Sequence, residues 1–150
     1  MPGVAPARAI GPLIPTSRGA MSRGLTLDYL DHPIAICRLP PETPIPAWAW
    51  TARYFVTVSR TEQELSITAD ADVMPADVPS QRDYRAFRVR GTIGFGLIGL
   101  LSSIIRPLSE AGIGILSIGT HDTDYVLVKE DEVEHAKSAL ERAGHHVVGR

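Results

Sequence analysis

The chain has 150 residues, of which 21% are charged and 44% are apolar, and its formal net charge is -2. This length gives room for one ordinary domain or two very small ones, and the composition is that of a globular protein. Without an excess of positive charge, the chain is not expected to bind nucleic acid or anionic lipid. The single cysteine, Cys37, excludes an internal disulfide, and no Cys/His cluster has the spacing of a structural zinc site. We therefore expect a cytoplasmic protein that needs no metal or other cofactor.

The N-terminal segment differs from the rest of the chain in composition. Residues 1–23 are rich in Pro, Gly and Ala, and contain three arginines but no acidic residue. They lack the continuous apolar core of a secretory signal, so we interpret them as a disordered tail. A transit peptide, which has the same basic character, and a start of translation at Met21 are the alternatives. The longest apolar stretch, Gly94 to Ile105, is shorter than the roughly 20 residues that cross a bilayer, so no membrane span is predicted.

The first half of the chain contains two regions with strand-like composition. Leu25 to Leu39 is predicted to form a hairpin that turns at His32-Pro33, and Tyr54 to Ala69 a second hairpin that turns at residues 61–64. Residues 70–80, with three aspartates and two prolines, have the composition of either a short helix or a linker.

From Tyr84 onward the patterns are more regular. Apolar and basic residues alternate in Arg85 to Arg90, which is typical of a strand with one solvated face. A glycine-rich bend follows, and an apolar stripe at intervals of three and four then predicts a helix that ends at Gly112. The stripe consists of Leu97, Leu100, Leu101, Ile104, Ile105 and Leu108. Ile113 to Ile118 is apolar on both faces, as in a strand that is covered on both sides.

The polar segment 120–124 favours a reversal of direction, after which Tyr125 to Val128 resumes as a strand. Asp131 and Glu134 have the spacing of a capping box at the start of a second helix. His145 to Val148 is predicted to be the last strand.

The order strand, helix, strand, strand, helix, strand within about 65 residues is that of the ferredoxin-like βαββαβ unit. The predicted fold class is therefore α+β, with an antiparallel sheet that carries both helices on one face. The other face favours association with another module or another copy of the chain.

A glycine string precedes the first predicted helix. Gly94-Phe95-Gly96-Leu97-Ile98-Gly99 matches the G-x-G-x-x-G pattern of dinucleotide sites, follows a strand and opens a helix. Against nucleotide binding, the next strand is predicted to turn back in a hairpin, and the chain is too short for a doubly wound sheet. The glycines also suit a tight bend between strand and helix, and Gly94 is a candidate for backbone contact with a ligand.

Candidate catalytic residues are few. Cys37 and His32 would supply a nucleophile and a base, but no third group is placed to orient them, and a buried, inert cysteine is the favoured interpretation. Asp122 and Asp124 lie two residues apart and are equally well explained as ordinary turn formers. No third acidic residue is near enough in sequence to complete a metal site. We therefore predict no catalytic residue and no metal ligand.

Four stretches of the sequence carry a family resemblance: Asp31 to Pro40, Glu64 to Ile67, Pro107 to Ile113 and Ser117 to Val128. They resemble the CASTOR-type ACT proteins, over roughly residues 24–148. The resemblance implies ACT modules in tandem, with a degenerate ACT-like module at residues 24–80 and an ACT domain at residues 84–150. It also implies a protein without catalytic activity that holds an amino acid where modules meet.

The resemblance also implies which residues would bind the ligand. Positions that face the amino acid in the family match Thr120 and Asp124, and the turn after the first helix matches Gly112 to Ile115. Gly114 stands where the arginine-holding module has a serine, so a hydroxyl contact is missing here and arginine is in doubt as the ligand. The predicted ligand-binding residues are Gly94, Gly112, Ile113, Gly114, Ile115, Thr120, Asp122 and Asp124.

The function expected from these features is that of a homodimeric sensor or regulatory protein. It would bind an amino acid or a similar metabolite and act on a protein partner, without being an enzyme. The alternative is a structural interaction module that no longer binds a ligand, which Gly114 and the irregular first half would favour.

Overall fold

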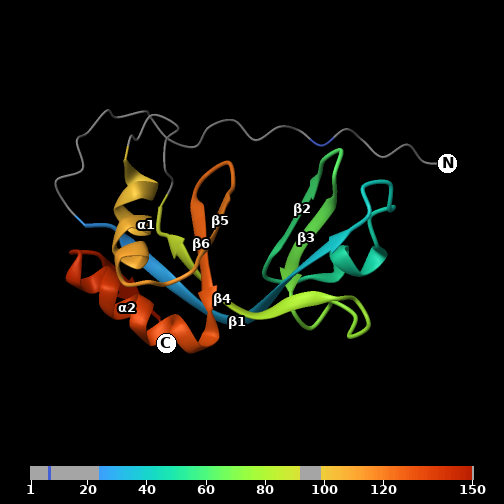
Figure 1. Ribbon diagram of the computed structural model, residues 1–150. Helices are drawn as coiled ribbons and strands as arrows, with labels where there is room; N and C mark the ends of the chain where they lie inside the picture. Colours follow the sequence, from blue (N-terminus) through green and yellow to red (C-terminus); the bar gives the residue numbers. More distant parts are fainter. Residues whose placement is uncertain (1–6, 8–23, 92–98, 150) are drawn as a thin grey trace.

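The structure is a computed structural model that describes residues 7, 24–91 and 99–149 (Figure 1). In this part of the chain, strands and helices form a mixed α+β fold, which confirms the predicted class. The strands are β1 (Thr26–Leu39), β2 (Val56–Arg60), β3 (Leu65–Asp70), β4 (Ser80–Val89), β5 (Leu116–Gly119), β6 (Asp124–Lys129) and β7 (His146–Val148). The helices are α1 (Leu100–Glu110) and α2 (Val133–Arg142), with the 3-10 turns η1 (Ala47–Thr51) and η2 (Glu130–Glu132).

All the described strands belong to one curled sheet. Their order is β2-β3-β1-β4-β6-β5, and β7 pairs with β1 from outside this path. Pairing is antiparallel throughout, except between β1 and β7. β1 and β4 form the base, from which the β2–β3 hairpin (the N-terminal hairpin) and the β5–β6 hairpin (the C-terminal hairpin) rise at opposite sides (Figure 1). The inner face of the sheet therefore lies between the two hairpins.

Three apolar clusters follow from the alternation of side chains along the strands. On the outer face, strands pack under α1 and α2 through a core that includes Leu27, Phe87, Val89, Ile104, Leu108, Val126, Val128 and Leu140. A second outer cluster joins the N-terminal hairpin to η1 and to the loop after β3, and includes Ala35, Cys37, Ala49, Leu65, Ile67, Ala69 and Met74. The third cluster fills the bend of the inner face and contains Ile34, Phe55, Tyr84, Ala86 and Leu127.

Helix α1 confirms the predicted first helix, although it contains a proline. Its buried residues are Leu100, Ile104 and Leu108. Pro107 has no N–H, so the Ser103 carbonyl four residues earlier lacks its usual donor in the helix. His145 takes this place, because its Nε2 lies 2.8 Å from the Ser103 oxygen, while its Nδ1 accepts the Leu25 N–H at 3.1 Å. These two partners assign one neutral tautomer to the buried imidazole.

The prediction of a hairpin turn at His32-Pro33 is wrong, because β1 continues through this dipeptide. Residues 31–33 have no strand partner in the described sheet: the register with β4 shifts between Leu30 and Ile34, and β7 and β3 pair with the two ends of β1. A proline without an N–H therefore breaks no ladder bond at this point.

Two predictions about the C-terminal half are also wrong. Asp131 lies within η2, α2 begins at Val133, and no side-chain hydrogen bond caps that helix, so Asp131 and Glu134 do not form a capping box. The predicted sheet is antiparallel throughout, whereas the last strand, β7, pairs in parallel with the start of β1. β1 therefore lies between β7 and β4, and the helices cover β7-β1-β4-β6-β5 instead of a sheet built from the C-terminal half alone.

The other reversals are confirmed. β2 and β3 form a hairpin around residues 61–64, and β5 and β6 form a hairpin around residues 120–123. Residues 71–79 contain turns and no helix, which supports the linker interpretation. The predicted contact residue Gly94 lies outside the described residues. No helix in the described ranges is long and apolar enough to cross a membrane.

Candidate functional site

The predicted ligand residues that the structure describes lie around β5, the outermost strand at one end of the sheet. Gly112 to Ile115 connect α1 to the start of β5, and Thr120 to Asp124 connect its end to β6. A strand of four residues separates the two groups by about 13 Å. The fold therefore places them on one strand, at opposite ends.

The turn at the end of β5 is held by threonine side chains. Thr120 donates its N–H and its hydroxyl to the Thr123 carbonyl, at 2.8 and 3.0 Å, and Thr123 donates its N–H back to that hydroxyl at 3.3 Å. Thr123 also donates its hydroxyl to the Val89 carbonyl of β4 at 2.8 Å. Asp122 contacts its neighbour His121, with 2.7 Å between Oδ1 and Nδ1. These contacts fix the shape of the turn.

Asp124 differs from the other turn residues because its carboxylate has no partner among the described residues. It is half-buried, stands opposite Gly119, and its side chain takes part in no hydrogen bond or ion pair with the described residues. A Cβ on Gly119 would lie 3.2 Å from Asp124 Oδ1, so a side chain at this position would press on the carboxylate. A half-buried carboxylate of this kind can accept charge-assisted hydrogen bonds from a cationic group.

Unlike the turn that contains Asp124, the turn after α1 has no charged side chain and can offer a ligand only backbone groups. Gly112 has a φ of 75°, a left-handed conformation that suits glycine, and its N–H donates to the Ser109 carbonyl at the end of the helix. Ile113 is buried, whereas Gly114 is exposed. A Cβ at Gly114 would meet no atom within 4 Å, so there is open space beside this turn.

Within the described sheet, no strand pairs with the outer edge of β5 between these two groups. In an antiparallel pair, hydrogen-bonded and non-hydrogen-bonded positions alternate, and the bond from Thr120 N–H to the Thr123 carbonyl fixes the alternation. Ser117 and Gly119 then occupy non-hydrogen-bonded positions, so that their N–H and C=O groups point away from β6. An open edge of this kind can pair with another strand.

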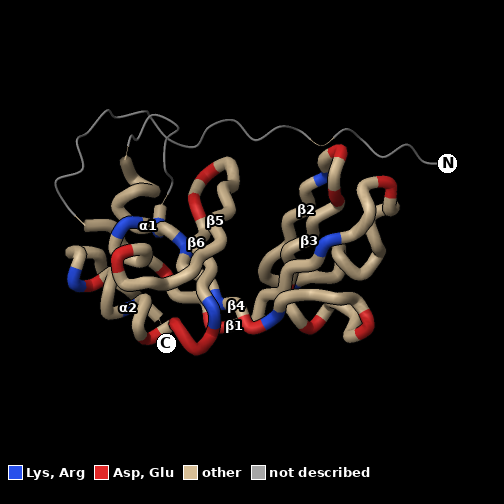
Figure 2. The backbone as a smooth tube through the Cα atoms, viewed as in Figure 1, with Lys and Arg blue, Asp and Glu red and all other residues tan. Residues whose placement is uncertain are grey.

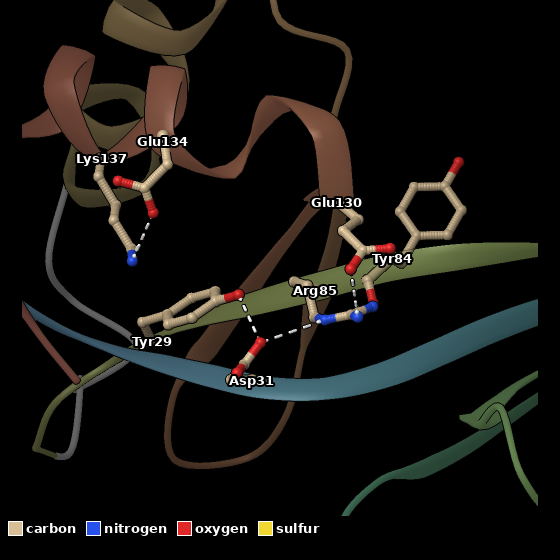
Figure 3. Close-up of polar contacts among 7 residues, drawn as sticks. All are labelled: Tyr29, Asp31, Tyr84, Arg85, Glu130, Glu134 and Lys137. Atoms are coloured by element: carbon tan, nitrogen blue, oxygen red, sulfur yellow. Dashed lines mark hydrogen bonds and ion pairs between the residues drawn. The ribbon is translucent and has the colours of Figure 1, made fainter. Parts of the chain in front are cut away.

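On the outer face, a buried guanidinium connects the base of the sheet to the start of α2 (Figure 3). Arg85 of β4 is 8% exposed, and its nitrogens lie 3.4 Å from Asp31 Oδ1 and 3.0 Å from Glu130 Oε1. It also donates to the Tyr84 carbonyl at 3.1 Å. Because two carboxylates compensate this charge, Arg85 is a structural ion-pair residue and offers no vacant site for an anion.

The same network extends to α2 through Tyr29. The Tyr29 hydroxyl donates to Asp31 at 2.9 Å, and Lys137 Nζ lies 4.2 Å from the centre of the tyrosine ring (Figure 3). Glu134 pairs with Lys137 at 3.0 Å. Burial, and then the hydrogen bond to Asp31, raises the pKa of Tyr29 to about 12, so the phenol keeps its proton at neutral pH. This network positions α2 against β1.

The structure does not bring Cys37 and His32 together. They lie five residues apart on one strand, or roughly 16 Å. Burial raises the pKa of the Cys37 thiol, which disfavours the nucleophilic thiolate. His32 Nε2 instead lies 3.6 Å from Asp70 Oδ1, and the His32 ring stacks on Tyr54 with 4.4 Å between centres. Within the described ranges, no group of three His, Cys, Asp or Glu residues is arranged to hold a metal ion.

Asp70 is a buried charged residue that the sequence analysis did not single out. Its carboxylate accepts the N–H groups of Arg53, Tyr54 and Phe55, at 2.7, 2.9 and 2.9 Å, and the residue is 3% exposed. No local pattern indicates this contact, because only the pairing of β2 with β3 brings residues 53–55 to the end of β3. Asp70 therefore holds the entry to β2 and has no vacant position for a ligand.

Comparisons with known proteins cover both halves of the chain. Residues 79–142, from β4 to α2, match the ACT domain family, and residues 33–77 match a family described as an N-terminal domain. Among curated proteins, no relative matches the chain.

Three solved structures show the same fold. Protein Atu0741 from Agobacterium tumefaciens is 35% identical, with a TM-score of 0.79 over 85% of this chain and 94% of that one. Protein VC0802 from Vibrio cholerae, described as a possible transport protein, is 15% identical, with a TM-score of 0.65 over 81% and 91%. The ligand-free regulatory subunit of aspartate kinase from Thermus thermophilus is 15% identical, with a TM-score of 0.51 over 76% and 93%. The chain therefore belongs to the same family as Atu0741, and its residues 79–142 match the ACT domain.

Proposed function

We propose that the protein is a non-catalytic regulator that binds a small metabolite, an amino acid in the first instance, at a site completed by two copies of the chain. The observation that carries the proposal is the carboxylate of Asp124, which has no partner among the described residues and lies beside an edge of β5 that no described strand pairs with, within the segment that matches the ACT domain. The structural likeness to a regulatory subunit of aspartate kinase supports a regulatory role.

A second copy of the chain would bring the two groups of predicted ligand residues together. If two β5 strands paired in an antiparallel manner about a twofold axis, the start of one strand would lie beside the end of the other. Gly112 to Ile115 of one chain would then face Thr120 to Asp124 of its partner. Backbone groups near Gly114 would bind the carboxylate of an amino acid, and Asp124 would bind its ammonium group or a cationic side chain.

The tandem arrangement is part of the same proposal. Residues 24–80 would be a degenerate ACT-like module and residues 84–150 the ACT domain. The separate outer clusters support this division, because the cluster around Ile67 is formed entirely within the N-terminal segment. The continuous strand β1 and the strand β4 connect the two modules, since each contributes residues to both ends of the sheet.

Calorimetric titration of the purified protein with each of the twenty amino acids tests the proposal. We expect one or a few to bind, and Asp124→Asn to weaken that binding about tenfold or more, since a charge-assisted contact is lost. Asp77→Asn, an exposed substitution in the loop before β4, is the matched control and should bind as the wild type does. If none of the amino acids binds at about 5 mM, a concentration that detects even weak complexes, the protein is not an amino-acid sensor.

The proposed dimer has its own test. Ser117→Pro removes an N–H that points to the open edge, so it should leave the β5–β6 pairing intact while preventing a second strand from pairing. Light scattering should show a dimer for the wild type and a folded monomer for the variant. A variant that remains dimeric with an unchanged affinity would place the interface elsewhere.

A further inference from the structure

A cleft lies on the inner face of the sheet, between the N-terminal hairpin and β5. Its volume is about 330 Å³, at the small end of the range of ligand sites. Hydroxyl side chains of β2 and β3 line one wall, and Leu116 and Ile118 of β5 line the opposite wall. Figure 1 shows the two hairpins facing each other across the base formed by β1 and β4.

The hydroxyl wall is a regular array. Thr57 stands opposite Thr68 and Ser59 opposite Ser66 in the pairing of β2 with β3. All four side chains share one face of the hairpin, because the intervening residues, such as Val58 and Ile67, pack into the outer cluster. Directly opposed residues have Cβ atoms about 5 Å apart, so the four hydroxyls form a compact grid.

These hydroxyls have no hydrogen-bond partner in the part of the chain that the structure describes. None of the four side chains takes part in a hydrogen bond with the described residues. Thr68 is the most informative of them, since only 3% of this residue is exposed although it lines the cleft. Thr68 Oγ1 is not among the fully buried side-chain atoms that lack a partner, so this hydroxyl is reached from the cleft and can donate to or accept from a bound molecule.

The lining also defines the chemistry of a ligand. No charged side chain lines the cleft, and Figure 2 shows the charged residues of the hairpins near their tips and at the base. A free amino acid would bring an ammonium and a carboxylate group into contact with uncharged walls, which is unfavourable. A ring with hydroxyl groups at its edge and C–H groups on its face would satisfy both walls.

We propose that this cleft is a second binding site, which takes a small uncharged polyhydroxylated ring compound of monosaccharide size. Thr57, Ser59, Ser66 and Thr68 bind the hydroxyl edge of the ring, and Leu116 and Ile118 contact its apolar face. The site is separate from Asp124 and the turn after α1, so it does not depend on amino-acid binding. The ligand bridges the N-terminal hairpin and β5, and therefore contacts both ends of the curled sheet.

Titration of the full-length, ¹⁵N-labelled protein with D-glucose and with myo-inositol tests this site by NMR. With either probe, added up to about 50 mM, we expect saturable shifts of the amide signals of residues 57–59, 66–68 and 116–118. Thr68→Val keeps the shape of the side chain and removes its hydroxyl, so it should weaken binding about tenfold. Ser138→Ala, which removes an exposed hydroxyl on α2, should leave the affinity unchanged.

Ser66→Ala provides a second variant in case Thr68→Val does not fold, and it should also weaken binding. The proposal is overturned if neither probe gives saturable shifts, or if both cleft variants bind as the wild type does. It is also overturned if amino acids shift the signals of residues 57–59 and 66–68, which lie away from the proposed amino-acid site, at lower concentration than the two probes, because the cleft would then accept charged ligands.

Discussion

The two ends of the curled sheet are stabilised in different ways. Around the C-terminal hairpin, two amphipathic helices cover the outer face and bury a large apolar core. Around the N-terminal hairpin, the described residues that cover the sheet are those of η1 and an irregular loop, with a smaller cluster beneath them. Part of the stability there comes from charged side chains bonded to the backbone.

Arg82 and Asp70 are two of these charged residues. Arg82 donates to the carbonyls of Ala71, Met74 and Pro75, at 3.0, 3.0 and 2.8 Å, and thereby holds the loop after β3. Asp70 accepts three N–H groups at the entry to β2. Where helices do not satisfy backbone groups, a charged side chain can bond to several of them at once. The comparison shows that a thin cover over a sheet can be held in part by charged side chains that bond to the backbone.

The largest expected effect on stability comes from the apolar core beneath the two helices. Ile104→Ala removes a fully buried side chain beneath α1 and should lower the free energy of unfolding by about 4 kcal/mol. Urea denaturation followed by circular dichroism measures this change. Ile105→Ala, on the half-buried flank of the same helix, is the control and should cost less than half as much. Equal losses would mean that α1 is not packed as described.

Asp70→Asn tests the contribution of charged side chains around the N-terminal hairpin. The amide retains a single acceptor oxygen and turns an NH₂ group toward backbone N–H groups, so we expect a loss of about 3 kcal/mol. Urea denaturation measures the loss, and hydrogen exchange should show faster exchange at residues 53–55 than in α1. Asp72→Asn, at an exposed position two residues away, should change stability by less than about 0.5 kcal/mol. A tolerated Asp70→Asn would refute the view that this carboxylate holds the entry to β2.

Local patterns explain what the sequence could predict of this fold. The apolar stripe of α1 and the polar reversal between β5 and β6 each lie within a few residues, so they can be recognised from sequence alone. The path of β1 could not be, because Pro33 is tolerated only where the strand has no partner, and distant β3, β4 and β7 decide that. The pairing of β7 with β1 instead of β4 is another non-local choice.

For the candidate sites too, local patterns predict some features, and distant contacts decide the others. Apolar and hydroxyl residues alternate in Val56 to Ser59 and in Leu65 to Thr68, which indicates one solvated face on each strand. That this face lies opposite β5 follows only from the curl of the sheet. The amino-acid site around Asp124 stays a prediction, because its two parts lie at opposite ends of one strand and would need a second chain to meet.

His145 links the two kinds of stabilisation, since it is a polar residue within the helical half. His145→Ala would leave the Ser103 carbonyl and the Leu25 N–H without partners, and would open a cavity beside α1. We expect a loss of about 2 kcal/mol, measured by urea denaturation. His146→Ala, at the exposed neighbouring position, is the matched control. An equal, small effect of both substitutions would show that the carbonyl freed by Pro107 needs no donor.

The smallest effect concerns an ion pair of the helical half that is open to solvent on one side. Asp28 lies 2.9 Å from Arg88 and also contacts Arg90, and the hydrogen bond from Arg90 is the first cause that lowers the pKa of Asp28 below its ordinary value of 3.8. The two arginine side chains are 42% and 52% exposed, so solvent screens these contacts and they should contribute less than buried Asp70.

The sign of the pH dependence follows from the lowered pKa of Asp28. A carboxylate whose pKa is lower in the folded state stabilises the protein at pH values above its ordinary pKa, and this contribution is lost as the pH falls through the folded value. The stability difference between the wild type and Asp28→Asn, from urea denaturation at several pH values, should be constant above about pH 5 and shrink below about pH 4. A difference that grew on acidification would mean that Asp28 is protonated in the folded protein, and the contrast between exposed ion pairs and the buried carboxylate of Asp70 would no longer hold.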